Sequence, residues 1–122
     1  MAIETALVTG SNGDVGRATV AELDSAGYRV ASFDREGGRP EGADDHWTGD
    51  LLDPETVRAA LAESGADAVA HLGTIPNPGG RPGHETYRSN AMTTYHVLEA
   101  AAEYGVERVS LASSINAVGA VF

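Results

Sequence analysis

Glycines between a short apolar run and an amphipathic segment are the feature that most constrains the fold of this chain. Residues 10–16 carry the spacing G-x-x-G-x-x-G directly after residues 5–9, whose apolar and β-branched side chains are typical of a buried parallel strand. Apolar positions then recur at helical spacing over residues 14–26, and Gly27 supplies a helix stop. A strand, a glycine turn and a helix in this order predict the first unit of a parallel sheet.

The rest of the chain repeats this alternation of strand-like and helix-like segments. Further strands are expected at residues 29–34, 46–48, 68–72 and 108–112, with helices at residues 53–64 and 86–104. Asp53 and Pro54 are typical of a helix start, since Asp accepts bonds from free amides and Pro suits the first turn. The alternation predicts right-handed connections and an α/β fold, a doubly wound parallel sheet of the Rossmann type with strand order 3-2-1-4-5.

Composition limits the chain to one domain and excludes several classes of function. The 122 residues are 42% hydrophobic, enough for a single packed core within residues 1–122. A formal net charge of -10 disfavours nucleic-acid binding, because the chain would repel phosphate backbones. No apolar run is long enough to span a bilayer and the start is not leader-like, so we expect a cytoplasmic protein without membrane contact. The lack of cysteine excludes disulfides, thiolate catalysis and cysteine-based zinc sites, and we expect no metal site.

All the basic residues are arginine, and the chain contains no lysine. An acidic, lysine-free composition fits a salt-loving source, and it fits equally a GC-rich genome that favours arginine codons. Stability measured against KCl separates these alternatives, because only a protein from a salt-loving source should depend on molar salt.

The glycine pattern also carries a functional prediction, because its position matches that of dinucleotide-binding turns. In such a turn Gly10 permits the tight bend, Gly13 lets a pyrophosphate approach the backbone, and Gly16 lets the helix pack on the strand. Amides at the start of the helix, those of residues 12–15, would then bind the anion. The predicted cofactor contacts in this loop are Gly10, Asn12, Gly13, Asp14, Val15 and Gly16. The alternative is a glycine-rich turn without a ligand.

An acidic residue at the end of the second expected strand supports the cofactor prediction. Asp34 lies close to the distance from the glycine pattern at which such folds place an acid on the adenosine ribose. A carboxylate there binds a 2′-hydroxyl and repels a 2′-phosphate, which favours NAD over NADP. Arg35 is the competing signal, because a guanidinium beside the ribose can bind the phosphate of NADP; otherwise it is a solvated loop residue.

With these motifs the chain resembles the extended short-chain dehydrogenase/reductase superfamily, and within it the NAD-dependent epimerase/dehydratase family. The resemblance covers essentially the whole chain. Its motifs in order are the glycine loop at residues 9–16, Asp34, Gly49-Asp50-Leu51, His71-Leu72-Gly73, Asn90 and Ser113-Ser114. It implies an oxidoreductase that binds NAD and acts on a small-molecule, sugar-type substrate, and a homodimer formed through the helix at residues 86–104.

Individual positions take their expected roles from this resemblance. Asp50 and Leu51 would contact the adenine ring, with capping of the turn before the next helix as the alternative for Asp50. His71 is expected to be a packed strand-end residue rather than a catalyst. Asn90 would be a polar contact near the active site and the cofactor, or an asparagine on an exposed helix face. The contacts implied on the ribose and nicotinamide side are Leu72, Gly73 and Thr74.

The catalytic serine of this family corresponds to the serine pair that follows the last expected strand. Ser114 is the implied catalytic residue, with Ser113 as the second choice and as a substrate contact. The stretch 113–119 is most similar to uronate dehydrogenases, which oxidise the anomeric hydroxyl of a sugar acid to a lactone. Ile115 departs from the polar substrate contact common in that subgroup, and Asn116 is expected to replace it.

The family's general base, a tyrosine four positions before a lysine, has no counterpart in this chain. No tyrosine here can be part of such a pair, because there is no lysine. Residues 119–122 show no helix stop, so we expect the natural chain to continue into the final strands and a substrate region. The resemblance then implies the cofactor-binding portion of an NAD-dependent oxidoreductase acting on a sugar or sugar-acid hydroxyl. The alternatives are a non-catalytic NAD(P)-binding or sensing module and a nucleotide-sugar epimerase or dehydratase.

Overall fold

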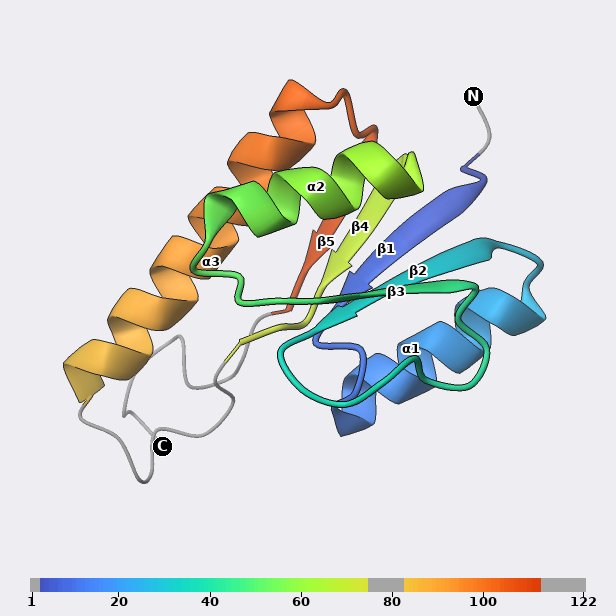
Figure 1. The fold of residues 1–122 in the computed structure, drawn as a ribbon, viewed down its shortest axis with the longest axis horizontal. Helices are drawn as coiled ribbons and strands as arrows, with labels where there is room; N and C mark the ends of the chain where they lie inside the picture. Colours follow the sequence, from blue (N-terminus) through green and yellow to red (C-terminus); the bar gives the residue numbers. More distant parts are fainter. Residues whose placement is uncertain (1–2, 75–82, 113–122) are drawn as a thin grey trace, which may run out of the picture.

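A parallel sheet with helices on both faces makes up the part of the chain that the computed structural model describes, residues 3–74 and 83–112 (Figure 1). Its strands are β1 (Thr5–Thr9), β2 (Arg29–Asp34), β3 (Asp45–Thr48), β4 (Ala68–His71) and β5 (Arg108–Leu111). Its helices are α1 (Asp14–Ser25), α2 (Pro54–Ser64) and α3 (Gly83–Glu103). The order β3-β2-β1-β4-β5, with every neighbouring pair parallel, confirms the predicted fold class and topology.

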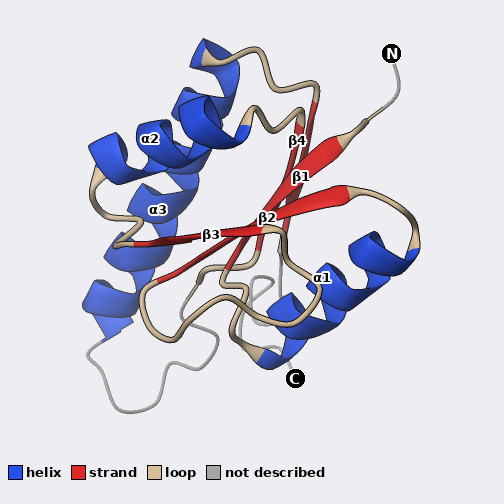
Figure 2. Cartoon of the chain, turned by 45° about the vertical axis from the view of Figure 1, so that its right-hand side comes forward, coloured by secondary structure: helices blue, strands red, loops and turns tan. Residues whose placement is uncertain are grey.

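The two faces of the sheet are covered by different helices, as Figure 2 shows. Helix α1 lies on one face, where Val8, Val20 and Val30 form a small buried cluster. Helices α2 and α3 lie together on the other face, over a larger cluster that includes Leu7 and Phe33. Burial on both faces explains why the strands are nearly continuous apolar runs rather than alternating ones.

The carboxyl ends of β1, β2 and β4 meet at one edge of the sheet because these strands are parallel. The register places Thr9 beside both Phe33 and His71, which are the matching positions on the two neighbouring strands. Connections leave the two sides of β1 in opposite directions, so a crevice opens between the turns that follow these strands.

Helix α2 begins and ends as the sequence predicts. Asp53 accepts the amide of Glu55 at 3.1 Å and the hydroxyl of Thr56 at 3.0 Å, and Pro54 occupies the first turn. Gly65 ends the helix in the left-handed conformation, with φ of 65°. These caps fix the position of the loop before α2, which contributes to the crevice.

The observed element boundaries lie within one residue of those predicted, except at the start of α3. Strand β3 begins at Asp45 rather than residue 46, because the Asp45 carbonyl accepts the Ser32 hydroxyl at 3.0 Å and Asp45 pairs with Ala31. Helix α3 begins at Gly83, earlier than residue 86, and ends at Glu103. No helix in the described residues is long and apolar enough to cross a membrane.

Candidate functional site

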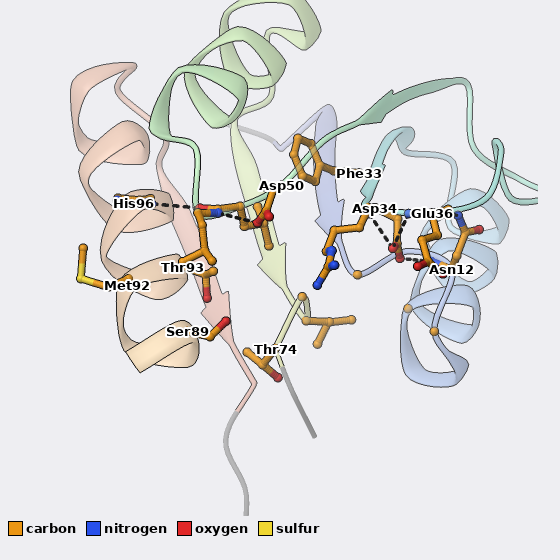
Figure 3. Close-up of a pocket in the computed structure, with 18 of the residues that line it drawn as sticks. Asn12, Phe33, Asp34, Glu36, Asp50, Thr74, Ser89, Met92, Thr93 and His96 are labelled. Atoms are coloured by element: carbon orange, nitrogen blue, oxygen red, sulfur yellow. Dashed lines mark hydrogen bonds between the residues drawn. The ribbon is translucent and has the colours of Figure 1, made fainter. Parts of the chain in front are cut away.

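A cleft of about 1030 Å³ lies at the carboxyl ends of β1, β2 and β4 (Figure 3). Its walls come from the glycine loop, the turn after β2, the loop before α2, the turn after β4 and one face of α3. The predicted cofactor residues that line it are Gly10, Asn12, Gly13, Asp14, Val15, Gly16, Asp34, Arg35, Asp50, Leu51, Leu72, Gly73 and Thr74. These predicted residues come from four separate segments of the sequence, and the face of α3 is a fifth.

The glycines of the loop are constrained differently. Gly10 has φ of +68°, and a β-carbon there would lie 2.7 Å from the backbone of Leu72 and Gly73. A β-carbon on Gly16 would lie only 1.9 Å from the Gly10 carbonyl oxygen, so Gly16 is needed for α1 to pack on the turn. At Gly13 the nearest such contact is an ordinary 3.5 Å, which leaves the backbone open toward the cleft.

The first turn of α1 provides hydrogen-bond donors to this cleft. No side chain caps the helix, and the amides of Asp14, Val15 and Gly16 have no acceptor within residues 3–74 and 83–112. The expectation that the amides of residues 12–15 all face an anion is wrong for two of them. The Asn12 amide donates to Asp34 Oδ2 at 2.9 Å, and the Gly13 amide closes a turn onto the Gly10 carbonyl at 3.1 Å. The free donors therefore start at Asp14 and extend to Gly16.

Asp34 is held in place by backbone amides from two loops. Its Oδ2 accepts from Asn12, while its Oδ1 accepts from Arg35 at 2.7 Å and from Glu36 at 3.3 Å (Figure 3). Such bonds orient the carboxylate: Oδ1 uses both of its acceptor positions on these two amides, and Oδ2 keeps one position for a further donor. The guanidinium of Arg35 is exposed at the cleft and has no carboxylate partner in the described part of the chain.

A buried polar cluster supports the turn after β4. Thr9 Oγ1 accepts the amides of Leu72 and Gly73, both at 3.0 Å, which uses both of its lone pairs. Its hydrogen is therefore directed to His71 Nδ1, 2.7 Å away, and His71 is the neutral tautomer protonated on Nε2. Burial lowers the pKa of His71 to about 4, and the ring is 1% exposed. This confirms the prediction that His71 is packed.

The loop before α2 is held between its own turn and α3. Asp50 Oδ1 accepts the amide of Leu52 at 2.9 Å, which is the turn-capping role considered as its alternative. The Asp50 side chain is nevertheless exposed at the cleft, so the turn does not remove it from the site. His96 Nδ1 donates to the Leu51 carbonyl at 2.9 Å, which ties α3 to this loop.

One face of α3 forms a wall of the cleft that the sequence reasoning missed. Ser89 and Thr93 point toward the strand ends in Figure 3. Helical spacing was the available signal, since the wall residues recur every three or four positions. The lining residues not predicted are Phe33, Glu36, Leu52, Glu85, Arg88, Ser89, Met92, Thr93 and His96.

Within the described part of the chain, Asn90 is the predicted cofactor residue that does not line the cleft. Asn90 is half-buried on α3 and is not among the lining residues; its carbonyl accepts the Thr93 hydroxyl at 3.3 Å. Its contact with a cofactor stays a prediction. Ser113, Ser114 and Asn116 lie outside the described residues. Within the described ranges, no group of histidines and acids is arranged to hold a metal ion.

Known proteins similar to this chain share its sequence pattern and its fold. An NAD-dependent glucose-6-phosphate dehydrogenase of Haloferax volcanii is 35% identical over 120 residues, which cover 93% of this chain and 44% of that protein. The crystal structure of a uronate dehydrogenase from Agrobacterium tumefaciens superposes with a TM-score of 0.78 at 30% identity, covering 93% of this chain and 42% of that one. The chain thus spans less than half the length of these relatives.

A structure with bound cofactor is also among the similar ones. The UDP-glucose 4-epimerase of Thermus thermophilus in complex with NAD has a TM-score of 0.78 at 29% identity, over 86% of this chain and 36% of that one. The sequence profile of the NAD dependent epimerase/dehydratase family matches residues 6–121. That match runs from β1 through the glycine loop and past β5. The chain belongs to the NAD dependent epimerase/dehydratase family.

Proposed function

We propose that this chain is the cofactor-binding portion of an NAD-dependent oxidoreductase that acts on a hydroxyl of a sugar or sugar acid. The observation that carries the proposal is the arrangement of two complementary groups at one cleft. The free amides at the first turn of α1 suit a pyrophosphate, and the oriented carboxylate of Asp34 suits a ribose. Residues 1–122 would then be the amino-terminal part of one NAD-binding domain.

The residues at the cleft fit a dinucleotide in chemistry as well as in position. The amides of residues 14–16 would bind the pyrophosphate, helped by the dipole of α1 and by the open backbone at Gly13. Asp50 and Leu51 would contact adenine, and residues 72–74 would line the nicotinamide side. When bound, NAD supplies a hydride acceptor for the oxidation of an alcohol.

The proposal favours NAD over NADP. Both oxygens of the Asp34 carboxylate are fixed by amides, so the negative charge stays at the edge of the cleft. A 2′-hydroxyl can donate to that carboxylate, whereas a 2′-phosphate would be repelled by it. Arg35 is exposed beside it and is the residue that an NADP-binding alternative would use.

The chemical step needs residues that this chain does not contain. Ser114, with Ser113 as second choice, would hydrogen-bond the reacting hydroxyl, and Ser113 and Asn116 would contact substrate. The family's tyrosine–lysine pair would have to come from residues outside 1–122, because the chain has no lysine. A glucose-6-phosphate dehydrogenase and a uronate dehydrogenase among the relatives support an anionic sugar as substrate.

A nucleotide-sugar epimerase is the second candidate. UDP-glucose 4-epimerases of Bacillus subtilis, 29% identical, and of Thermus thermophilus favour it. The two functions differ in what happens to the cofactor, since a dehydrogenase releases NADH and an epimerase does not accumulate it. The family relationship also supports a homodimer and a cytoplasmic location as parts of the proposal.

Two assays on the full-length protein test the proposal. Calorimetric titration should show tighter binding of NAD than of NADP, and Asp34→Asn should narrow that difference. NADH should accumulate with NAD and one of a panel of uronic acids and aldose phosphates. NAD binding without NADH formation on any of these sugars would remove the dehydrogenase proposal; turnover of a UDP-sugar without NADH would favour the epimerase.

A further inference from the structure

The side chain of Asn12 fastens the glycine loop to the loop after β2. Its amide nitrogen, Nδ2, donates to the carbonyl oxygen of Glu36 at 2.8 Å and to that of Gly38 at 3.0 Å. Its backbone amide donates to Asp34 Oδ2 at 2.9 Å. One residue therefore holds both the acidic side chain at the end of β2 and the loop that follows it, as Figure 3 shows for Asn12, Asp34 and Glu36. We refer to the two side-chain bonds as the Asn12 clamp.

The loop closes so tightly on Asn12 that the position facing it has to be glycine. Gly37 lies between the two carbonyls of the clamp and has φ of +79°, a conformation that other residues rarely adopt. A β-carbon there would also lie 2.9 Å from Asn12 Nδ2. A side chain at Gly37 would therefore strain the loop and push it away from Asn12.

The clamp separates two hollows of the surface. Asn12 and Glu36 line the cofactor cleft, and they also line a second hollow of about 920 Å³ between α1 and residues 36–42. That second hollow carries the arginines Arg17 and Arg39. That hollow also carries the acidic side chains of Asp24, Glu36 and Glu41, whereas Arg35 lies on the cleft side of the clamp.

We infer that the Asn12 clamp is a specificity device that enforces the choice of NAD. It keeps Asp34 and the amides of Arg35 and Glu36 in the arrangement that suits a 2′-hydroxyl and that turns a fixed carboxylate toward a 2′-phosphate. Asn12 is a positioning residue in this account, acting through Asp34 and through the loop. The inference rests on the proposed function, since it needs NAD to bind in the cleft.

The test compares nucleotide selectivity in the full-length protein and in variants that open the clamp from either side. Asn12→Ala removes the Nδ2 group that makes both bonds, and Gly37→Ala displaces the loop from the opposite side while leaving every residue of the glycine loop unchanged. Each variant should lower the ratio of NADP to NAD dissociation constants, measured by calorimetry, by about tenfold. Thr19→Ala is the matched control on α1, because Thr19 bonds only the Val15 carbonyl and lines neither hollow. Its ratio should equal that of the wild-type protein.

A second measurement needs no nucleotide. Amide hydrogen exchange should accelerate at Arg35 and Glu36 in Asn12→Ala, because the loop that presents these amides to Asp34 is released. Equal weakening of NAD and NADP, or unchanged exchange, overturns the inference and leaves Asn12 a purely structural residue. If Asn12→Ala does not fold, Gly37→Ala decides by the same ratio. If the wild-type protein binds neither nucleotide, the proposed function fails first; if it prefers NAD and both variants keep that preference, only the inference fails.

Discussion

At the scale of single residues, the site depends on polar groups whose partners are distant in the sequence. Thr9 and His71 are 62 positions apart, and Asn12 and Asp34 are 22 positions apart. The sequence predicts that His71 is packed and that Asp34 faces the cleft, because strand ends and motif spacing determine both. It does not predict that the Asn12 amide serves Asp34 rather than an anion, since a hydrogen bond between two loops depends on their tertiary approach.

The neutral state of His71 should make stability depend on pH. Its folded-state pKa, about 4, is below the ordinary value of 6.5, so between these values the unfolded chain binds a proton that the folded chain does not. Stability from this group is therefore complete above pH 6.5 and is lost as the pH falls toward 4, by about 3 kcal/mol in total.

Urea unfolding of wild-type protein and His71→Gln at pH 7 and pH 4.5 measures this effect. The wild-type protein should lose more free energy of unfolding than the variant over this interval, because glutamine does not titrate. Acidic side chains titrate in both proteins. The contribution of His71 is therefore the difference between the two proteins in how much free energy of unfolding each loses. Equal losses would show that His71 is not held neutral by burial in the folded protein.

At the scale of elements, the order of strands and helices follows from the sequence, but the cleft does not. Alternating apolar runs and helix caps predict every strand and helix described here, and the largest difference is the earlier start of α3. The wall formed by α3 was not predicted, because which face of a helix borders a cleft depends on how the helix crosses the sheet. Residue types such as Ser89 and Met92 do not by themselves indicate that this face of α3 lines a cleft.

Gly16 and Gly13 provide a matched pair of substitutions within one turn. Gly16→Ala places a β-carbon 1.9 Å from the Gly10 carbonyl oxygen, so α1 has to move off β1 and stability should fall by several kcal/mol, on the order of severe core overpacking. Gly13→Ala meets only a 3.5 Å contact at φ of -77°, so folding should be nearly unaffected.

The Gly16→Ala and Gly13→Ala variants also distinguish an effect on helix packing from an effect on NAD binding. Gly13→Ala should weaken NAD binding by at least about tenfold, since a methyl group would stand between the pyrophosphate and the backbone. Thermal unfolding and calorimetric titration of both variants provide the readouts. Wild-type NAD affinity in a folded Gly13→Ala protein would exclude the close approach of a pyrophosphate at this residue.

At the scale of the whole molecule, the chain presents an acidic surface with an exposed apolar stretch on α3. Tyr87, Tyr95 and Leu98 are exposed on this helix, at 77%, 57% and 42%. Their spacing along the helix places them on one side of it. Exposed apolar groups in this number on one helix support the homodimer expected from the family.

A charge placed on this side of α3 tests the homodimer. Light scattering of the full-length protein should give the mass of a dimer, and Leu98→Arg should give that of a monomer, because an unpaired charge would be buried in the interface. Tyr104→Arg adds the same charge just beyond the end of α3, at a residue 44% exposed, and should remain dimeric. A monomeric wild-type protein would contradict the prediction.

The central claim is that the cleft at the ends of β1, β2 and β4 holds NAD. A crystal structure of the full-length protein grown with saturating NAD tests it most directly. We expect the pyrophosphate to lie at the amides of Asp14, Val15 and Gly16, and the adenosine ribose to lie within hydrogen-bond distance of Asp34. Density for NAD at any other place, or an empty cleft in a crystal saturated with NAD, would contradict it.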